Sequence, residues 1–185
     1  MDFNGQDFFL SEDYIDFDAT DNCVIASITY DPEYIYCDQL GETVPVTVTV
    51  TDVNGNSNDC VANILVTGLP CGWMDFVDDG IGCEGGNDAS YDVPSETFTL
   101  VSDGCYSSNW AADDAAYVKY ELCGDGEIVA HVTAFNPIGG GWAGISARET
   151  EAVGSKKVAL ATNLGNFLRR EIRTTTNGYS IPQQF

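Results

Sequence analysis

The stretch that decides the fold is VPVTVTVTDVNGNSNDC, which runs from Val44 to Cys60. Its valines and threonines alternate strictly, and side chains on a strand alternate between two faces, so the valines should line a core and the threonines should meet water. Asn54-Gly55 suits the positive φ of a tight hairpin turn. A second run of a single parity follows the turn: Cys60, Ala62, Ile64 and Val66. The stretch therefore predicts a β-hairpin with one buried face.

Short apolar runs separated by turn residues continue along the whole chain, and no apolar stripe of helical period persists. One run, GEIVAHVTAF, holds the only histidine, His131, which we expect on a strand. The spacing of the runs predicts an all-β fold built from sandwiches. The other runs that we expect as strands include DFFL, VIASITY, EYIYC, CVANILV, WMDFVDDG, ASYDV, ETFTLVSDG, AAYVKYEL, WAGISARE, KKVALATN and NFLRREIR.

The charge of the chain is strongly negative, with 29 acidic and 7 basic residues among 185 and a net charge of −22. Phosphate groups are bound by clustered Lys and Arg, so this balance argues against nucleic acid and anionic membranes as partners. Six of the seven basic residues lie between 148 and 173, and 26 of the 29 acidic residues lie at or before Glu127. The basic segment predicts either docking on another acidic surface or charges on the solvent faces of strands.

Seven cysteines are scattered along the chain without a C-x-x-C spacing, so with a single histidine they form no zinc pattern. In an acidic, β-rich chain they predict disulfides and an oxidising compartment, and hence a secreted, extracellular or cell-surface location. The count is odd, so either one thiol is free or its partner lies outside this chain. The candidates are Cys23, Cys37, Cys60, Cys71, Cys83, Cys105 and Cys123.

The first residues, MDFNGQDFFLSEDY, lack the apolar core of a signal peptide, and no run approaches the ~18 apolar residues of a membrane helix. We therefore expect the export signal to lie outside this chain, and we expect no direct membrane insertion.

The residues predict no enzyme. His131 has no evident nucleophile partner, and no G-x-S-x-G is present. Glu127 and Glu149 could form the carboxylate pair of a glycosidase, but each is equally a surface or ion-paired residue. We therefore expect no catalytic residues.

Calcium is the candidate cofactor, because hard oxygen ligands cluster in DFDATDN and DVNGNSND. The alternative for both clusters is turn formation, since Asp and Asn side chains bind their own backbone. The candidate metal ligands are Asp16, Asp18, Asp21, Asp52, Asn54 and Asn56.

Exposed aromatic residues that would cover sugar faces are the second kind of candidate site. Trp142 follows a glycine triplet, so a place in the core is its alternative. The candidate ligand-binding residues are Tyr106, Trp110, Asp113, Asp114 and Trp142.

The segments DFDATDNCVIASITY and TVTVTDVNGNSNDCVANILV resemble the hyalin-repeat (HYR) domain, an immunoglobulin-like sandwich found in tandem in large extracellular proteins. The resemblance covers about residues 1–67. It implies a preceding strand that carries a cysteine, and that cysteine would suit Cys60. Cys23 and Cys37 lie at the two ends of an expected hairpin and could pair with each other.

The segments CGDGEIVAHVT, GWAGISARE and GSKKVAL resemble the concanavalin/laminin-G-like jelly rolls of secreted bacterial surface proteins, in which further strands follow the turn that matches TTTNG. We therefore expect an HYR-like β-sandwich over 1–67, a junction over 68–72 and the N-terminal part of a jelly roll over 73–185. Both sandwiches are expected to be incomplete at the chain ends.

The two resemblances imply a structural or adhesive segment of a large secreted bacterial cell-surface protein, acting as a spacer, stalk or filament subunit. Sandwiches that lack strands expose unpaired edges, so a longer polypeptide or a neighbouring chain is expected to complete them. The expected partners are other copies or other segments of the same surface protein. The alternative function is a carbohydrate-binding module with glycans as partners.

Overall fold

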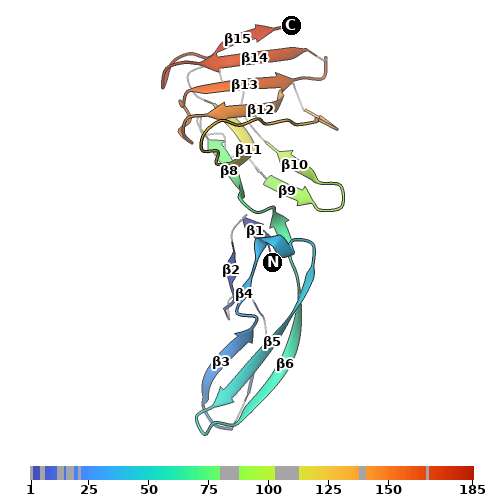
Figure 1. Ribbon diagram of the computed structural model, residues 1–185, viewed down its shortest axis with the longest axis vertical. Coiled ribbons are helices and arrows are strands. Elements are labelled where there is room, and N and C mark those ends of the chain that lie inside the picture. The colour runs from blue at the N-terminus through green and yellow to red at the C-terminus, as the bar shows by residue number, and fades with distance from the viewer. Residues whose placement is uncertain are drawn as a thin grey trace. The chain divides into compact units, whose positions relative to one another are not determined.

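The structure is a computed structural model, and the fold is all-β, as the sequence predicts (Figure 1). Within the described residues there are strands and one short 3-10 helix, and no helix has the length and apolar composition needed to cross a bilayer. The described residues are 2–4, 7–11, 15, 19–20, 22–79, 88–102, 113–137, 141–165 and 167–185.

The chain forms two compact units, each of which draws on separate stretches of sequence. The first unit contains residues 1–75, 89–100 and 118–121, and the second contains 76–88, 101–117 and 122–185. The contiguous domains that the sequence predicts, with their junction at 68–72, stay a prediction.

The first unit is built around a three-stranded antiparallel sheet in the order β3-β5-β6. A parallel β1-β7 pair, an antiparallel β2-β4 pair and a β9-β10 pair accompany this sheet. The elements that begin in this unit are β1 (Asp2–Asn4), β2 (Phe8–Phe9), β3 (Ile25–Asp31), β4 (Tyr34–Ile35), the 3-10 helix η1 (Cys37–Gln39), β5 (Thr43–Asp52), β6 (Ser57–Leu65), β7 (Thr67–Leu69), β8 (Trp73–Asp79), β9 (Asp88–Asp92) and β10 (Thr97–Val101).

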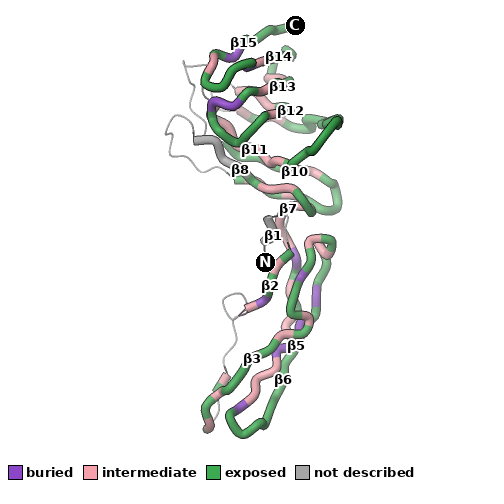
Figure 2. Tube along the Cα trace, turned by 60° about the vertical axis from the view of Figure 1, so that its left-hand side comes forward, coloured by how far each residue is buried: buried purple, intermediate pink, exposed green. Residues whose placement is uncertain are grey.

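The alternating valines of β5 form the centre of the core in the first unit. Val44, Val46 and Val48 are buried and Val50 is half-buried, which supports the predicted face, whereas the positions between them are exposed or half-buried (burial is coloured in Figure 2). Burying each of these side chains contributes about 1.5–3 kcal/mol. The buried residues that pack with them are Leu10, Ile15, Ile35 and Val66.

The predicted hairpin joins β5 to β6 around Gly55, whose φ of 87° lies in the left-handed region that glycine adopts without strain. Gly55 N donates to Asp52 O at 3.2 Å to close the turn. Cys60 pairs with the buried Val48 across the hairpin, yet its own side chain is exposed. The expectation that Cys60 lines the core was therefore wrong.

The second unit is dominated by a four-stranded antiparallel sheet in the order β12-β13-β14-β15. β11 pairs with β8 in a separate two-stranded sheet. The strands are β11 (Asp114–Tyr120), β12 (Ala143–Arg148), β13 (Lys157–Thr162), β14 (Leu168–Arg173) and β15 (Ile181–Gln184).

The segment from 121 to 137 corrects one sequence prediction. The run GEIVAHVTAF was expected to be a strand carrying His131, but residues 121–137 pair with no strand and are almost all exposed. Its alternating pattern is that of a strand, but a strand is stabilised only by a partner for its ladder. No such partner is present among the described residues.

Candidate functional site

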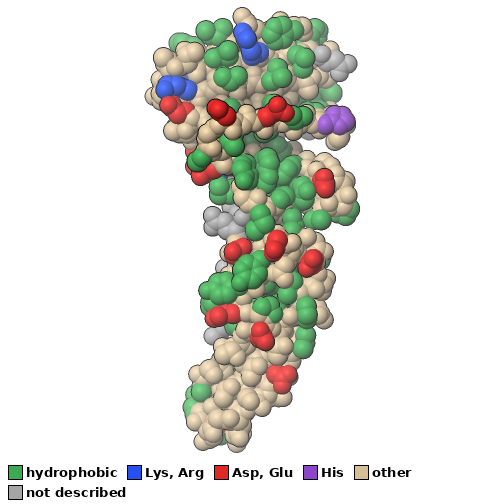
Figure 3. All heavy atoms as spheres, viewed as in Figure 1, with side chains coloured by type: hydrophobic (Ala, Val, Ile, Leu, Met, Phe, Trp, Pro, Cys, Tyr) green, Lys and Arg blue, Asp and Glu red, His purple; other side chains and the backbone are tan. Residues whose placement is uncertain are grey.

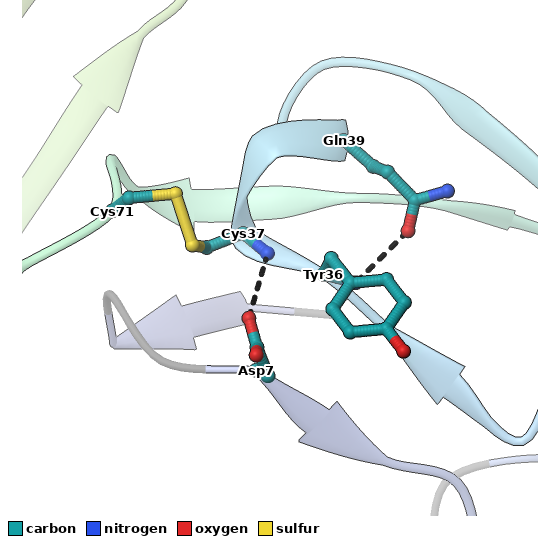
Figure 4. Close-up of a disulfide and its surroundings, with 5 residues drawn as sticks. All are labelled: Asp7, Tyr36, Cys37, Gln39 and Cys71. Atoms are coloured by element: carbon teal, nitrogen blue, oxygen red, sulfur yellow. Dashed lines mark hydrogen bonds between the residues drawn. A yellow bond between two sulfur atoms is a disulfide. The ribbon is translucent and has the colours of Figure 1, made fainter.

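The sulfur chemistry of the first unit centres on one disulfide between Cys37 and Cys71, with a Cα–Cα distance of 5.2 Å (Figure 4). It fastens η1 to the chain that follows β7. A loop of this length implies about 3–4 kcal/mol of stabilisation through the unfolded state. The predicted presence of disulfides is thereby confirmed.

The expected pairing of Cys23 with Cys37 is wrong. It assumed that the strands between them form a hairpin, but β3 pairs with β5 and β4 pairs with β2. Cys23 therefore lies at the far end of β3, where its sulfur accepts a hydrogen bond from Asn54 Nδ2 at 3.3 Å. Cys60 and Cys123 are exposed and in no disulfide of the described chain, and Cys83 and Cys105 lie outside the described residues.

The second set of metal candidates forms the turn after β5. The Asp52 carboxylate accepts hydrogen bonds from the backbone N–H groups of Asn54 and Asn56, both at 2.8 Å, and from Asn56 Nδ2 at 2.8 Å. The bonds from Asn56 do most to hold the pKa of Asp52 below its ordinary value. This is the turn-forming arrangement that the sequence left open as the alternative.

The first set of metal candidates, Asp16, Asp18 and Asp21, lies outside the described residues. Within the described residues, no three His, Cys, Asp or Glu side chains lie close enough together to hold a metal ion.

Among the described residues, the densest group of charged side chains is an ion-pair cluster around Asp113 in the second unit. The carboxylate lies 3.1 Å from Arg148 Nη1, 2.7 Å from Lys157 Nζ and 2.7 Å from Arg173 Nη2. Strand register explains why three cations meet there, because Arg148 pairs with Lys157 and Lys157 pairs with Arg173 across β12, β13 and β14. Asp113, the residue just before β11, thus contacts a row of three cations on one face of the sheet.

Arg173 is the most deeply buried member of this ion-pair cluster, with a side chain that is 0% exposed. Its second Asp113 contact, from Nη1, is 3.0 Å long. The same Nη1 donates to the carbonyls of Val153 and Ser155 at 3.1 and 3.0 Å, and Nε donates to Gly178 O at 3.1 Å. A buried guanidinium needs this many acceptors, because desolvation without them is costly.

Glu171 extends the cluster along β14. It accepts a 2.7 Å contact from Lys157 Nζ and pairs with Arg169. The Arg169 guanidinium lies 5.1 Å from the ring centre of Trp142, within range of a cation–π interaction. Trp142 is half-buried in this contact. This placement agrees better with the core position, which was its alternative, than with an exposed ring that covers a sugar.

Two competing effects set the protonation of the two carboxylates in the cluster. Burial by itself raises the pKa of Asp113, but hydrogen bonds from Arg173 and Lys157 outweigh it and hold that pKa below its ordinary value. Burial likewise acts against the charged form of Glu171, and the hydrogen bond and charge of Lys157 with the charge of Arg169 lower its pKa overall. Both groups are therefore ionised at neutral pH.

Only some of the remaining ligand candidates lie within the described residues. Asp113 is the hub of the ion-pair cluster, and Asp114 begins β11. Tyr106 and Trp110 lie outside the described residues. The structure therefore brings Asp113 and Trp142 to one face of one sheet, through Lys157, Glu171 and Arg169.

The sequence did not lead us to predict that the cations of the cluster lie in the interior. It offered solvent faces as one place for the charges of 148–173, whereas Lys157, Arg169 and Arg173 lie on the covered face of the sheet. The signal available in the sequence was that these three cations have the same strand parity as Glu171, which carries the opposite charge. That parity defines two faces of a strand, but not which of them is covered.

The other face of the β12–β15 sheet is apolar and exposed, and we call it the outer face. Val158 is 53% exposed and Ile181 is 63% exposed, although they belong to one apolar row across the sheet. Phe185 N donates to Leu168 O at 3.0 Å, which continues the ladder and gives Phe185 the parity of Ile181. The large apolar side chains exposed on the outer face are Val158, Leu160, Leu168, Ile181 and Phe185.

Comparisons with known proteins do not place the chain in a family. No family model, no curated protein and no solved structure matches it.

Proposed function

We propose that this chain is a structural, adhesive segment of a secreted bacterial cell-surface protein, serving as a spacer, stalk or filament subunit. The observation that carries the proposal is the outer face of β12–β15, where five large apolar side chains on one sheet are open to solvent. Contiguous exposed apolar surface on a soluble protein marks an interaction site. The proposal includes the identity of the domains, which would be an HYR-like sandwich followed by part of a jelly roll.

The disulfide and the charge balance support a place outside the cell. Disulfides persist in oxidising compartments, and Cys37–Cys71 joins two segments that are distant in sequence. The net charge of −22 favours solubility and disfavours nucleic acid as a partner. The partners in this proposal are other copies or other segments of the same surface protein.

Light scattering after size exclusion, over a wide range of protein concentration, tests the proposal. We expect the mass of the wild-type chain to rise with concentration and expect Leu160→Glu to abolish the rise, because it places a charge in the outer face. Val61→Glu is the matched control, since Val61 is exposed to a similar degree on β6. A wild-type chain that stays monomeric at every concentration contradicts the proposal, and retention of that monomer on a glycan array would favour the carbohydrate-binding alternative.

A further inference from the structure

The first unit carries an exposed group of aromatic rings on the β2–β4 ladder. Phe9 pairs with Tyr34, and their ring centres lie 5.3 Å apart in an edge-to-face arrangement. Tyr34 and Tyr36 stack with centres 6.5 Å apart. All three rings are about half exposed. Aromatic side chains arranged like this are enriched in the cores of protein interfaces.

The surroundings of these rings are negative. Continuing the β2–β4 register puts Asp7 opposite Tyr36, on the same side of the ladder as the rings. The Asp7 carboxylate accepts a hydrogen bond from Cys37 N at 3.5 Å, beside the disulfide (Figure 4). Asp38 follows and is exposed. We call Asp7, Phe9, Tyr34, Tyr36 and Asp38 the acidic aromatic patch.

The first 118 residues contain no Lys or Arg, and Lys119, which also belongs to the first unit, is the first cation in the chain. On the face drawn in Figure 3, Asp and Glu side chains lie over both units, and the Lys and Arg side chains lie over the second unit.

The outer face of β12–β15 is apolar and carries a positive charge, which is opposite to that of the acidic aromatic patch. Arg170 shares the parity of Leu168 and is exposed, with its guanidinium donating to the Gln183 side chain. The described strand residues of this face include no Asp or Glu. The outer face therefore offers a cation among aliphatic side chains, and the acidic aromatic patch offers carboxylates among rings.

We propose that the outer face of one copy binds the acidic aromatic patch of a second copy, with Arg170 stacked on the tyrosine rings and paired with Asp7 and Asp38. Arginine suits both contacts, because its planar guanidinium stacks on aromatic rings and binds carboxylates. The inference rests on the proposed function and names its partner.

A contact between two outer faces is the competing arrangement, and the charge of Arg170 argues against it. Such a contact would bring two arginines into an apolar interface that holds no carboxylate from either copy. Removing an unpaired charge from water is costly, whereas the acidic aromatic patch supplies counter-charges. A contact between two different surfaces also leaves each copy one unused surface for the next copy, which is the kind of contact that a stalk or filament requires.

The size of the two surfaces predicts a weak contact. Together they expose apolar area on the order of several hundred Å², whereas stable complexes bury about 1,200–2,000 Å². We therefore expect association that is visible at high protein concentration, or where many copies are held side by side, and that weakens with added salt.

Charge reversal on each surface, followed by mixing, tests this contact in the full chain by sedimentation velocity. Arg170→Glu alone, and Asp7→Lys with Asp38→Lys alone, should each lower the association constant about tenfold or more. An equimolar mixture of the two variants should recover association, because each native surface finds a native partner and the two reversed surfaces also match.

Matched variants control for net charge. Lys156→Glu changes charge as Arg170→Glu does, and Asp59→Lys with Asp125→Lys changes it as the patch variant does, at exposed positions outside both surfaces. These controls should associate like the wild type. If Leu160→Glu abolishes association while Asp7→Lys with Asp38→Lys leaves it unchanged, the contact proposed here is overturned and the proposed function stands. If the wild type never associates, both are overturned.

Discussion

The two units of this chain place their charged and apolar side chains in opposite ways. In the first unit, β5 buries Val44, Val46 and Val48 and turns its other side outward. In the second, the covered face of the sheet holds an ion-pair cluster that ends in the fully buried Arg173, and the apolar face is exposed. An alternating strand pattern therefore identifies two faces, and burial of the apolar one depends on what packs against the sheet.

The difference implies different sources of stability. Burial of apolar area stabilises the first unit without directional requirements. The ion-pair cluster of the second unit stabilises it only while every charge keeps its partners, because the interior charges are desolvated. Removing one partner should therefore be more damaging than removing one apolar side chain.

Asp113→Ala offers the largest expected effect. It leaves Arg173 buried without its carboxylate and takes the shared partner from Lys157 and Arg148, so we expect a loss of about 3–5 kcal/mol in the stability of the second unit. Hydrogen exchange of peptides covering β13 and β14 measures it. Glu149→Ala breaks the exposed pair with Lys156 and should cost about 1 kcal/mol or less. Equal effects from both variants would mean that the buried cluster has no special role.

Loss of the Cys37–Cys71 disulfide is the next largest change. The variant with both cysteines replaced by serine should lose about 3–4 kcal/mol, because the unfolded chain regains the freedom of the closed loop. Exchange of β5 and β6 amides measures the loss. Protection of β13 and β14 serves as the internal control and should stay unchanged.

Val46→Ala compared with Val158→Ala tests the contrast between the units directly, since both remove the same methyl groups from a strand. Val46 is fully buried, so we expect a loss of about 2–3 kcal/mol. Val158 is half exposed, so we expect a loss of about 0.5 kcal/mol or less at low protein concentration. Urea denaturation of the two variants measures both values. A large loss at Val158 in the dilute monomer would show that the outer face is covered within the chain.

Acid should have a smaller and graded effect on the second unit. The pKa values of Asp113 and Glu171 are lowered from 3.8 and 4.5 on folding, so their stabilisation is complete above those values and is lost as pH falls through the folded pKa values. The urea midpoint of the second unit should therefore fall as pH drops below about 4. Glu171→Gln should make the fall of the urea midpoint with decreasing pH less steep. An unchanged slope would contradict a lowered pKa of Glu171 in the folded chain.

Much of the fold could be predicted because local patterns coincide with pairing. The run KKVALATN became β13 and NFLRREIR became β14, since each found a neighbour of matching length. GEIVAHVTAF carries a similar pattern and formed no strand, because no partner ladder lies beside it among the described residues. The predicted pairing of Cys23 with Cys37 was wrong because it required β3 and β4 to pair with each other, whereas β3 pairs with β5 and β4 pairs with β2.

The candidate site was less accessible to sequence reasoning. Asp113 and Trp142 were named as ligand residues, but their cationic partners come from strands far along the chain. The Asp52 turn, in contrast, was available from the sequence as the alternative to a metal site, because the hydrogen bonds that the Asp52 carboxylate accepts from Asn54 and Asn56 span no more than four residues.

The sequence by itself determined the all-β class, the hairpin around Gly55 and the two faces of each paired strand, because these depend on side-chain parity and on turn residues within a few positions. The tertiary structure alone decided that Cys37 bonds Cys71, that Asp113 contacts three cations and that the apolar face of β12–β15 is the exposed one. These features depend on which distant strands become neighbours. Strand pairing and the coverage of a sheet are long-range choices that no local pattern contains.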